Sequence, residues 1–138
     1  MIPDNLNPNW VAGFMEAEDC FFVKSFINSK GNIQFVLGCQ IIQHSRDSML
    51  IKKFTSFFNC GRLETTRESE NFLVTKLLHI NEIIIPFLEK YPILGVKSKE
   101  FNDWKRIAFL MASKAHFTEE GAKEILKIKS SMNASRIE

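Results

Sequence analysis

Three carboxylates lie close together near the N-terminus. Glu16, Glu18 and Asp19 follow the stretch Trp10-Val11-Ala12-Gly13-Phe14-Met15, which predicts a helix. They would crowd the C-terminal end of that helix, where the dipole is negative and favours cations. Carboxylates placed against a local preference often mark a functional site. The alternative is that they only keep a helix end solvated.

The helix that must position these acids also has a face of small residues. Gly13 and Ala17 lie one turn apart on one face, with Ala12 beside them. A second helix could approach that face very closely. The helix begins either with Asn7 as its cap and Pro8 at the first helical position, or with Asn9 as its cap, and it ends at about Asp19.

The remaining elements follow from hydrophobic periodicity and turn residues. The sequence predicts two β-hairpins, each preceded by a helix, and then further helices. The expected elements are strands 20–28 and 33–43 joined at 29–32, a helix 45–58 capped by Ser45, strands 62–66 and 71–77 joined at 67–70, a helix 79–91 that Pro86 kinks or restarts, a helix 98–115 capped by Ser98, and a helix from Thr118 to about Met132.

Length and composition are those of a single globular domain covering residues 1–138, with 45% hydrophobic residues. The formal charge is only +2, so a polyanionic partner is permitted but not demanded. The odd number of cysteines, 3, favours a reducing compartment. With no signal peptide and no apolar run of membrane-spanning length, we expect neither secretion nor a membrane partner. Abundant Lys, Ile, Asn and Phe fit an AT-rich organellar gene, so a mitochondrial or chloroplast origin is expected, or otherwise an intracellular one.

Residues 11–19, VAGFMEAED, resemble the nonapeptide of the LAGLIDADG homing endonucleases. Four later segments also resemble family stretches, in the same order: 43–47, 86–92, 101–104, and 117–121 continuing to 132–133. The resemblance implies an α+β fold of order αββαββα with extra C-terminal helices and an antiparallel, saddle-shaped sheet.

The resemblance also implies an activity, which is site-specific hydrolysis of double-stranded DNA with Mg²⁺. Bound divalent ions can activate water and neutralise phosphate charge, and Mg²⁺ prefers carboxylate oxygens. The family's metal ligand falls on Glu18, and Asp19 is the second candidate. The matching positions make Gln40 and Lys97 catalytic candidates, with Lys99 as the substitute for Lys97. Glu16 is expected to cap or pair instead of binding metal.

One motif in one chain amounts to half of an active site in this family. The resemblance therefore implies a symmetric homodimer on a near-palindromic DNA target. The interface is expected at Ala12, Gly13, Glu16 and Ala17.

In the family, the sheet lies in the major groove and recognises the DNA. Strand alternation divides the first hairpin into two sets, and the set with Cys20, Phe22, Lys24, Phe26 and Asn28 is expected to face DNA together with Gln34, Val36, Gly38, Gln40 and Ile42. Polar side chains there and on the second hairpin can contact base edges, and basic residues at the turns can contact phosphates. The expected DNA contacts are Lys24, Asn28, Lys30, Gln34, Gln40, Arg62, Glu64, Thr66, Arg67, Asn71 and Thr75.

Two features depart from the family pattern. Asp19 stands where the family has glycine, which puts catalysis in question more than the fold. Apolar residues also occupy the expected DNA face, namely Phe22, Phe26, Val36, Ile42 and Leu73, and a strand register shifted by one residue would exchange the two faces. Two alternatives to a homodimeric endonuclease stay open: an RNA-binding maturase that assists intron splicing, and one half of a two-motif endonuclease without independent activity.

Overall fold

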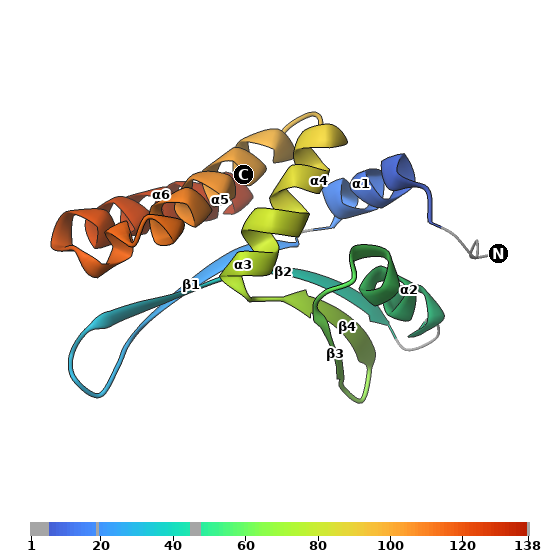
Figure 1. Cartoon of the computed structure of the whole chain (residues 1–138), viewed down its shortest axis with the longest axis horizontal. Helices are drawn as coiled ribbons and strands as arrows, with labels where there is room; N and C mark the ends of the chain where they lie inside the picture. Colours follow the sequence, from blue (N-terminus) through green and yellow to red (C-terminus); the bar gives the residue numbers. More distant parts are fainter. Residues whose placement is uncertain (1–5, 19, 45–47, 138) are drawn as a thin grey trace.

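The protein is an α+β structure in which helices cover one face of an antiparallel sheet (Figure 1). The computed structural model describes residues 6–18, 20–44 and 48–137. The elements are α1 (Pro8–Ala17), β1 (Phe21–Ile27), β2 (Ile33–His44), α2 (Ser48–Phe58), β3 (Arg62–Thr65), β4 (Ser69–Val74), α3 (Leu77–His79), a π-helical turn (Ile80–Ile84), α4 (Ile85–Lys90), α5 (Lys97–Ala112), a 3₁₀ turn (Ala115–Phe117) and α6 (Glu119–Ile137). This order confirms the predicted fold class. No helix in the described part of the chain is long and apolar enough to cross a membrane.

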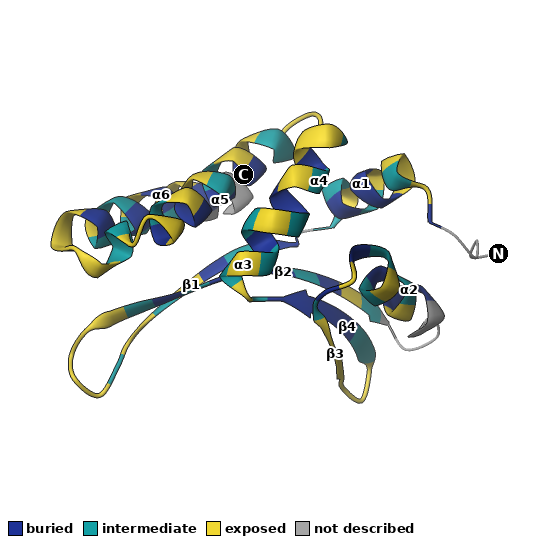
Figure 2. Ribbon diagram, in the orientation of Figure 1, coloured by how far each residue is buried: buried dark blue, intermediate teal, exposed yellow. Residues whose placement is uncertain are grey.

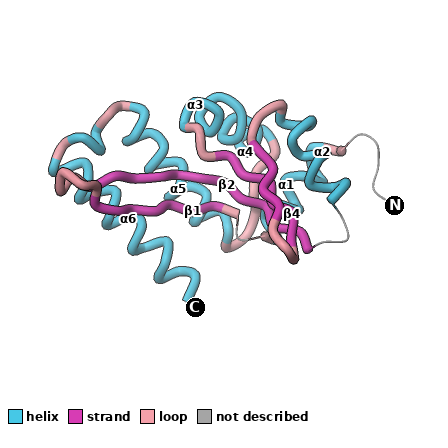
Figure 3. The backbone as a smooth tube through the Cα atoms, turned by 90° about the horizontal axis from the view of Figure 1, so that it is seen from below, coloured by secondary structure: helices cyan, strands magenta, loops and turns pink. Residues whose placement is uncertain are grey.

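The sheet has the strand order β1-β2-β4-β3, and every neighbouring pair is antiparallel. The described helices lie on one side of it, and no described element covers the opposite face (Figures 1 and 3). Burial follows the same division, because the sheet is largely buried where helices cover it and exposed along the two hairpin turns (Figure 2). We call the uncovered side the open face.

Helix α1 begins as the first of the two predicted alternatives requires. The Asn7 side-chain oxygen accepts hydrogen bonds from the backbone N–H groups of Asn9 (2.8 Å) and Trp10 (3.3 Å), and Pro8 occupies the first helical position. These bonds satisfy donors that a helix start otherwise leaves unpaired. The helix ends at Ala17, slightly before the predicted end at Asp19, which lies outside the described residues.

Trp104 on α5 connects the helical layer to the first hairpin. Its side chain is fully buried, and its indole Nε1–H donates to the carbonyl oxygens of Gly38 (3.0 Å) and Phe22 (3.3 Å). On the open face the Phe22 ring lies over Gly38, so closely that a Cβ added at Gly38 would fall 2.1 Å from the ring. Gly38 is therefore held between an aromatic ring on each side of the sheet.

Several predicted boundaries differ from the observed ones. Strand β4 begins at Ser69, so the second turn is shorter than the predicted segment 67–70. The Thr66 hydroxyl bonds to Ser69 and tightens this turn. Ser98 does not cap α5, which begins one residue earlier, and its hydroxyl donates to the Gly95 carbonyl (2.7 Å). The predicted Ser45 cap lies outside the described residues.

Pro86 restarts the helix after the second hairpin, as one of the predicted alternatives states. Proline lacks an N–H group and its ring clashes with the carbonyl four residues earlier. The chain accommodates it by a π-helical turn over Ile80–Ile84, in which Ile85 donates its N–H to the Ile80 carbonyl. Helix α4 then begins with Pro86 in its first turn, and both Ile84 and Ile85 are buried.

Candidate active site and nucleic-acid interface

Glu18 lies at the C-terminal cap of α1, where the chain turns from helix into extended backbone. Its backbone N–H donates to the Phe14 carbonyl (3.2 Å). Its side chain is half-buried and makes no hydrogen bond or ion pair with any residue that the structure describes. The carboxylate is therefore available to a ligand, whereas the second metal candidate, Asp19, lies outside the described residues.

Glu16 is engaged within the chain. Its carboxylate accepts a hydrogen bond from the backbone N–H of Leu94, in the connector between α4 and α5. Glu16 thus has a partner within the chain, and its exclusion from metal binding stays a prediction. The bond also holds the connector, and with it the start of α5, against the C-terminal end of α1.

Lys97, at the start of α5, lies close to Glu100 one turn later, with Nζ and Oε2 3.9 Å apart. Glu100 is only 7% exposed and was not predicted as a functional residue, although its spacing from Lys97 was visible in the sequence. The connector that leads to Lys97 is itself bonded to Glu16 of the carboxylate motif through Leu94. An acidic residue in the first turn of a helix is also favoured by the dipole.

Cys20 belongs to the core and not to the open face where alternation had placed it, because it is 1% exposed and precedes β1. Burial raises the pKa of its thiol well above the ordinary value, and Cys39 and Glu100 add to that effect. The thiol therefore stays neutral around pH 7. Cys20 adds no further negative charge beside Glu18.

Gln40 is tied directly to the end of the carboxylate motif. Its backbone N–H donates to the Cys20 carbonyl (2.7 Å), and its half-buried side chain lies opposite Leu73 of β4. The fold thus brings the segments that carry Glu18 and Gln40 together where β1 begins beside the middle of β2, and the Glu16–Leu94 bond holds the connector that precedes Lys97 against the end of α1. The three candidates come from α1, β2 and the start of α5, and their catalytic roles stay predictions.

The first hairpin has the register that alternation predicts. Phe22 pairs with Gly38, Lys24 with Val36, and Phe26 with Gln34, and the alternate residues of β1 and β2 are the buried ones. A shift by one residue is therefore excluded. The predicted DNA-facing set, apart from Cys20 and with Asn28 just beyond β1 in the turn, lies on the open face.

The apolar residues on the open face expose less surface than their number suggests. Phe22 lies over Gly38, Leu73 is 7% exposed and Val36 is half-buried. Only Phe26 and Ile42 are largely exposed, at 52% and 44%. Lys24 adds a charge beside Phe22, with its Nζ 5.2 Å from the ring centre.

Three residues predicted to contact DNA have partners or positions of another kind. The Asn28 side-chain oxygen accepts from the backbone N–H groups of Lys30 (2.9 Å) and Asn32 (3.0 Å) and so closes the first turn. Thr66 closes the second turn. Asn71 is buried in β4, and its Oδ1 has no hydrogen-bond partner within the described chain. The two basic turn residues, Lys30 and Arg67, are exposed as expected.

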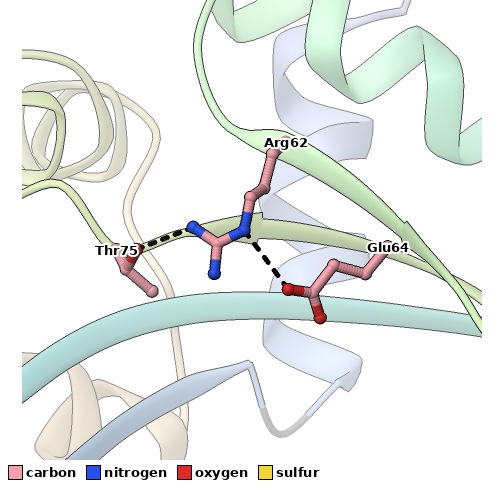
Figure 4. A network of polar contacts seen from close by, with 3 residues as sticks. All are labelled: Arg62, Glu64 and Thr75. Atoms are coloured by element: carbon pink, nitrogen blue, oxygen red, sulfur yellow. Dashed lines mark hydrogen bonds and ion pairs between the residues drawn. The ribbon is translucent and has the colours of Figure 1, made fainter.

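On the second hairpin, the predicted residues Arg62, Glu64 and Thr75 form a connected polar group (Figure 4). Arg62 Nε donates to Glu64 Oε1 (3.2 Å) and Arg62 Nη1 donates to Thr75 Oγ1 (3.0 Å). Arg62 and Glu64 are both exposed. The sequence placed these residues on one face but gave no sign that they bond to each other.

The small-residue face of α1 is divided between the core and the surface. Ala12 is 5% exposed and belongs to the chain's own core, so little of it remains for a partner. Gly13 and Ala17 are exposed, and a Cβ added at Gly13 would meet nothing within 4 Å. Trp10, also on α1, is 44% exposed.

The described residues of one chain hold no group of three or more histidine, cysteine or acidic side chains that could enclose a metal. The available oxygen donor at the motif is the Glu18 carboxylate, which suits a hard divalent cation. A complete site would need at least one further carboxylate. The Glu18 carboxylate is thus one oxygen donor that such a cation could use.

The comparisons with known proteins agree with this geometry. The model of the family described as LAGLIDADG endonuclease matches residues 11–108. Of the curated proteins, "Probable intron-encoded endonuclease 2" of Neurospora crassa is 37% identical over 126 residues, which cover 90% of this chain and 27% of that protein.

Solved structures match nearly the whole chain. The I-LtrWI LAGLIDADG homing endonuclease bound to target DNA has a TM-score of 0.91 at 40% identity, covering 98% of this chain and 47% of that one. I-SmaMI bound to uncleaved DNA in the presence of calcium ions has a TM-score of 0.88 at 34% identity, covering 96% and 48%. The homing endonuclease I-TnaI has a TM-score of 0.86 at 31% identity, covering 94% and 89%.

The chain thus spans about a quarter of the length of the curated relative and about half of I-LtrWI and I-SmaMI. The family match covers well over half of the chain and includes most of α1, both hairpins and most of α5. This chain belongs to the LAGLIDADG endonuclease family.

Proposed function

We propose that this chain is one half of a divalent-metal-dependent endonuclease that cuts double-stranded DNA at a specific site. Two copies would pair through α1 and present two open faces to a near-palindromic target. The DNA-bound relatives I-LtrWI and I-SmaMI support DNA as the substrate. The intron-encoded relative in N. crassa supports an intron gene, and relatives named for a cox1 intron and an ND4 intron support an organellar site of action.

The observation that carries the pairing is the environment of Gly13. Glycine inside a helix costs about 1 kcal/mol relative to alanine, and none of the residues that the structure describes lies close enough to Gly13 to require it. The missing side chain is useful only if something outside the chain approaches α1 closely. A second helix of the same kind satisfies that requirement and brings a second Glu18.

The lengths of the relatives favour one second candidate. Because the chain covers only about half of I-LtrWI, it could instead be one half of a two-motif endonuclease that needs a different half. The match to 89% of I-TnaI shows that a family structure of nearly this length also exists. Sedimentation equilibrium at micromolar concentration separates the candidates, because a homodimer requires twice the monomer mass and a lone half does not.

Mg²⁺ is the metal we propose, held by Glu18 of each half. When bound, it would activate water and neutralise charge on the scissile phosphate. Gln40 and Lys97 are proposed to orient water and hold protons beside it, because the fold brings their segments to the end of the motif. The calcium ions present with I-SmaMI support the use of a divalent cation.

The main test is selection from a randomised duplex DNA library in Ca²⁺, followed by transfer of the enriched sequences into Mg²⁺. We expect an enriched near-palindrome that is cut, and we expect Glu18→Gln to abolish cutting while binding remains. Enrichment without cutting by the unaltered chain would point to lost catalysis at Asp19. If no duplex is enriched, the homodimeric endonuclease is ruled out, and the next tests are binding of intron RNA, as a splicing maturase requires, and addition of a different second half.

Gly13→Leu tests the pairing. It should leave the isolated chain folded, because the site is open, and it should abolish dimerisation and cutting. Ala112→Leu is the matched control, since Ala112 is an exposed small residue on the distant helix α5. Normal cutting by a Gly13→Leu dimer would contradict the α1 interface.

A further inference from the structure

Arg62 lies on the open face of the sheet. It begins β3, and its cross-strand partner Leu73 pairs in turn with Gln40. Because directly opposed residues point to the same side of a sheet, Arg62 shares the open face with Gln40. Its side chain is 55% exposed there.

The guanidinium group of Arg62 is held in place before any ligand arrives. Glu64 accepts from Nε and Thr75 accepts from Nη1, on opposite sides of the planar group (Figure 4). An arginine side chain loses considerable rotamer freedom when it is fixed, and part of that loss has already occurred here. A ligand that binds Arg62 therefore causes a smaller further loss of side-chain entropy.

The donors that remain suit a planar ligand with two acceptors. A guanidinium group has five N–H donors, and the two bonds to Glu64 and Thr75 leave three. Among the residues that the structure describes, Nη2 bonds to none, so its two N–H groups and the second N–H of Nη1 are the donors available to a ligand. A cavity of about 200 Å³, partly lined by Arg62, Leu73 and Thr75, lies beside it.

We propose that Arg62 recognises a guanine in each half of the target, donating to N7 and O6, with Glu64 and Thr75 as positioning residues. This assignment depends on the proposed binding of duplex DNA. Arginine paired with N7 and O6 of guanine is a strongly discriminating contact in the major groove. A phosphate is the weaker candidate, because the Glu64 carboxylate beside Arg62 would repel it.

The sheet register also says where that guanine lies. Arg62, Leu73 and Gln40 form a cross-strand row, and Gln40 bonds to Cys20 at the end of the carboxylate motif. With strands about 4.8 Å apart, Arg62 lies roughly 14 Å from that motif. Gln34 lies six residues before Gln40 in β2, about 20 Å from it. The guanine should therefore lie nearer the cleavage centre than the base pairs that respond to Gln34.

The experiment is duplex selection in Ca²⁺ with the unaltered chain and four variants, each first checked for an unchanged thermal unfolding midpoint. Arg62→Ala should lose the guanine preference at one position per half-site, by roughly 10- to 100-fold. Glu64→Ala and Thr75→Val should weaken the same preference by about 2- to 10-fold. Arg67→Ala, which removes an exposed arginine at the turn of the same hairpin, should leave base preferences unchanged.

The outcomes distinguish a failure of the guanine contact from a failure of the proposed function. An enriched site whose base preferences are the same for Arg62→Ala as for the unaltered chain would overturn the guanine contact and leave DNA recognition intact. A uniform loss of affinity in Arg62→Ala, without a change at any position, would show a phosphate contact instead. If the unaltered chain enriches no duplex, both the proposed function and the guanine contact are overturned.

Discussion

The two hairpins share one open face but are stabilised in different ways. In the first, the backbone is fixed, because Trp104 on α5 bonds to the carbonyls of Phe22 and Gly38. In the second, the side chains are fixed, because Arg62 is bonded to Glu64 and Thr75. We infer that the first hairpin sets the shape that fits the duplex, whereas the second holds the groups that distinguish one base from another.

The same contrast appears in the chemistry of their exposed residues. Along β1 the open face carries Phe22, Lys24 and Phe26, which offer apolar contact and a single charge. Arg62 and Glu64 on β3 offer a donor and an acceptor in fixed directions. Apolar contact with thymine methyl groups discriminates less than a bidentate hydrogen bond does, so most specificity per residue should come from the second hairpin.

The largest effect should come from removing the anchor of the first hairpin. Trp104→Ala deletes a fully buried indole and should lower the free energy of unfolding by about 3–5 kcal/mol, measured by urea denaturation. Trp104→Phe should cost less and should speed amide hydrogen exchange in β1 and β2 more than in β3 and β4. Equal acceleration in both hairpins would contradict a separate anchor.

A smaller loss should follow from Gly38→Ala. The added methyl group would overlap the Phe22 ring, and overpacking of this kind costs about 1–3 kcal/mol. Because the clash is with that ring, Gly38→Ala combined with Phe22→Ala should be less destabilised than the two single losses added together. Simple additivity in this double-mutant cycle would show that the ring is not the obstacle.

The side chains that close the two turns should contribute about equally to the free energy of unfolding. Asn28→Ala and Thr66→Ala each remove bonds to turn backbone, and each should lower the free energy of unfolding by about 0.5–1.5 kcal/mol. Neither should change the base preferences of bound DNA. A change of base preference in either variant would show that the residue contacts DNA directly.

The smallest effects should come from the basic residues at the turns. Lys30→Ala and Arg67→Ala should each reduce the slope of log affinity against log salt by about one, as the loss of one phosphate contact predicts. Each variant should lose the same fraction of its affinity for every DNA sequence. A slope unchanged in one of them would show that the corresponding hairpin turn does not reach the DNA backbone.

Much of this fold could be predicted because its signals are local and periodic. Alternation along β1 and β2 gave the correct faces, since one residue in two must be buried under the helices. The residue types that begin helices narrowed the cap to Asn7 or Asn9, and the structure shows that it is Asn7. Cys20 was misassigned because alternation was extended one residue beyond the strand, where the chain is still leaving α1.

The details that the sequence did not reveal depend on contacts between distant segments. Glu16 bonds to a backbone amide in the α4–α5 connector, and no spacing rule relates them. Glu100 is buried, whereas an acidic residue in a first turn is normally solvated. Ala12 and Gly13 are adjacent small residues, and either could be buried. Which of them is buried depends on the rotation of α1 about its axis against the core, and the structure buries Ala12.

The π-helical turn at Ile80–Ile84 affects how this chain should be aligned with its relatives. Such a turn holds an extra residue compared with an α-helical turn, and here it absorbs the proline that follows. A relative without proline at the position of Pro86 would be free to form a regular helix with one residue fewer. Alignments across residues 77–90 should therefore allow a single-residue gap inside 80–84, because a gap placed elsewhere would misassign the buried positions of α4.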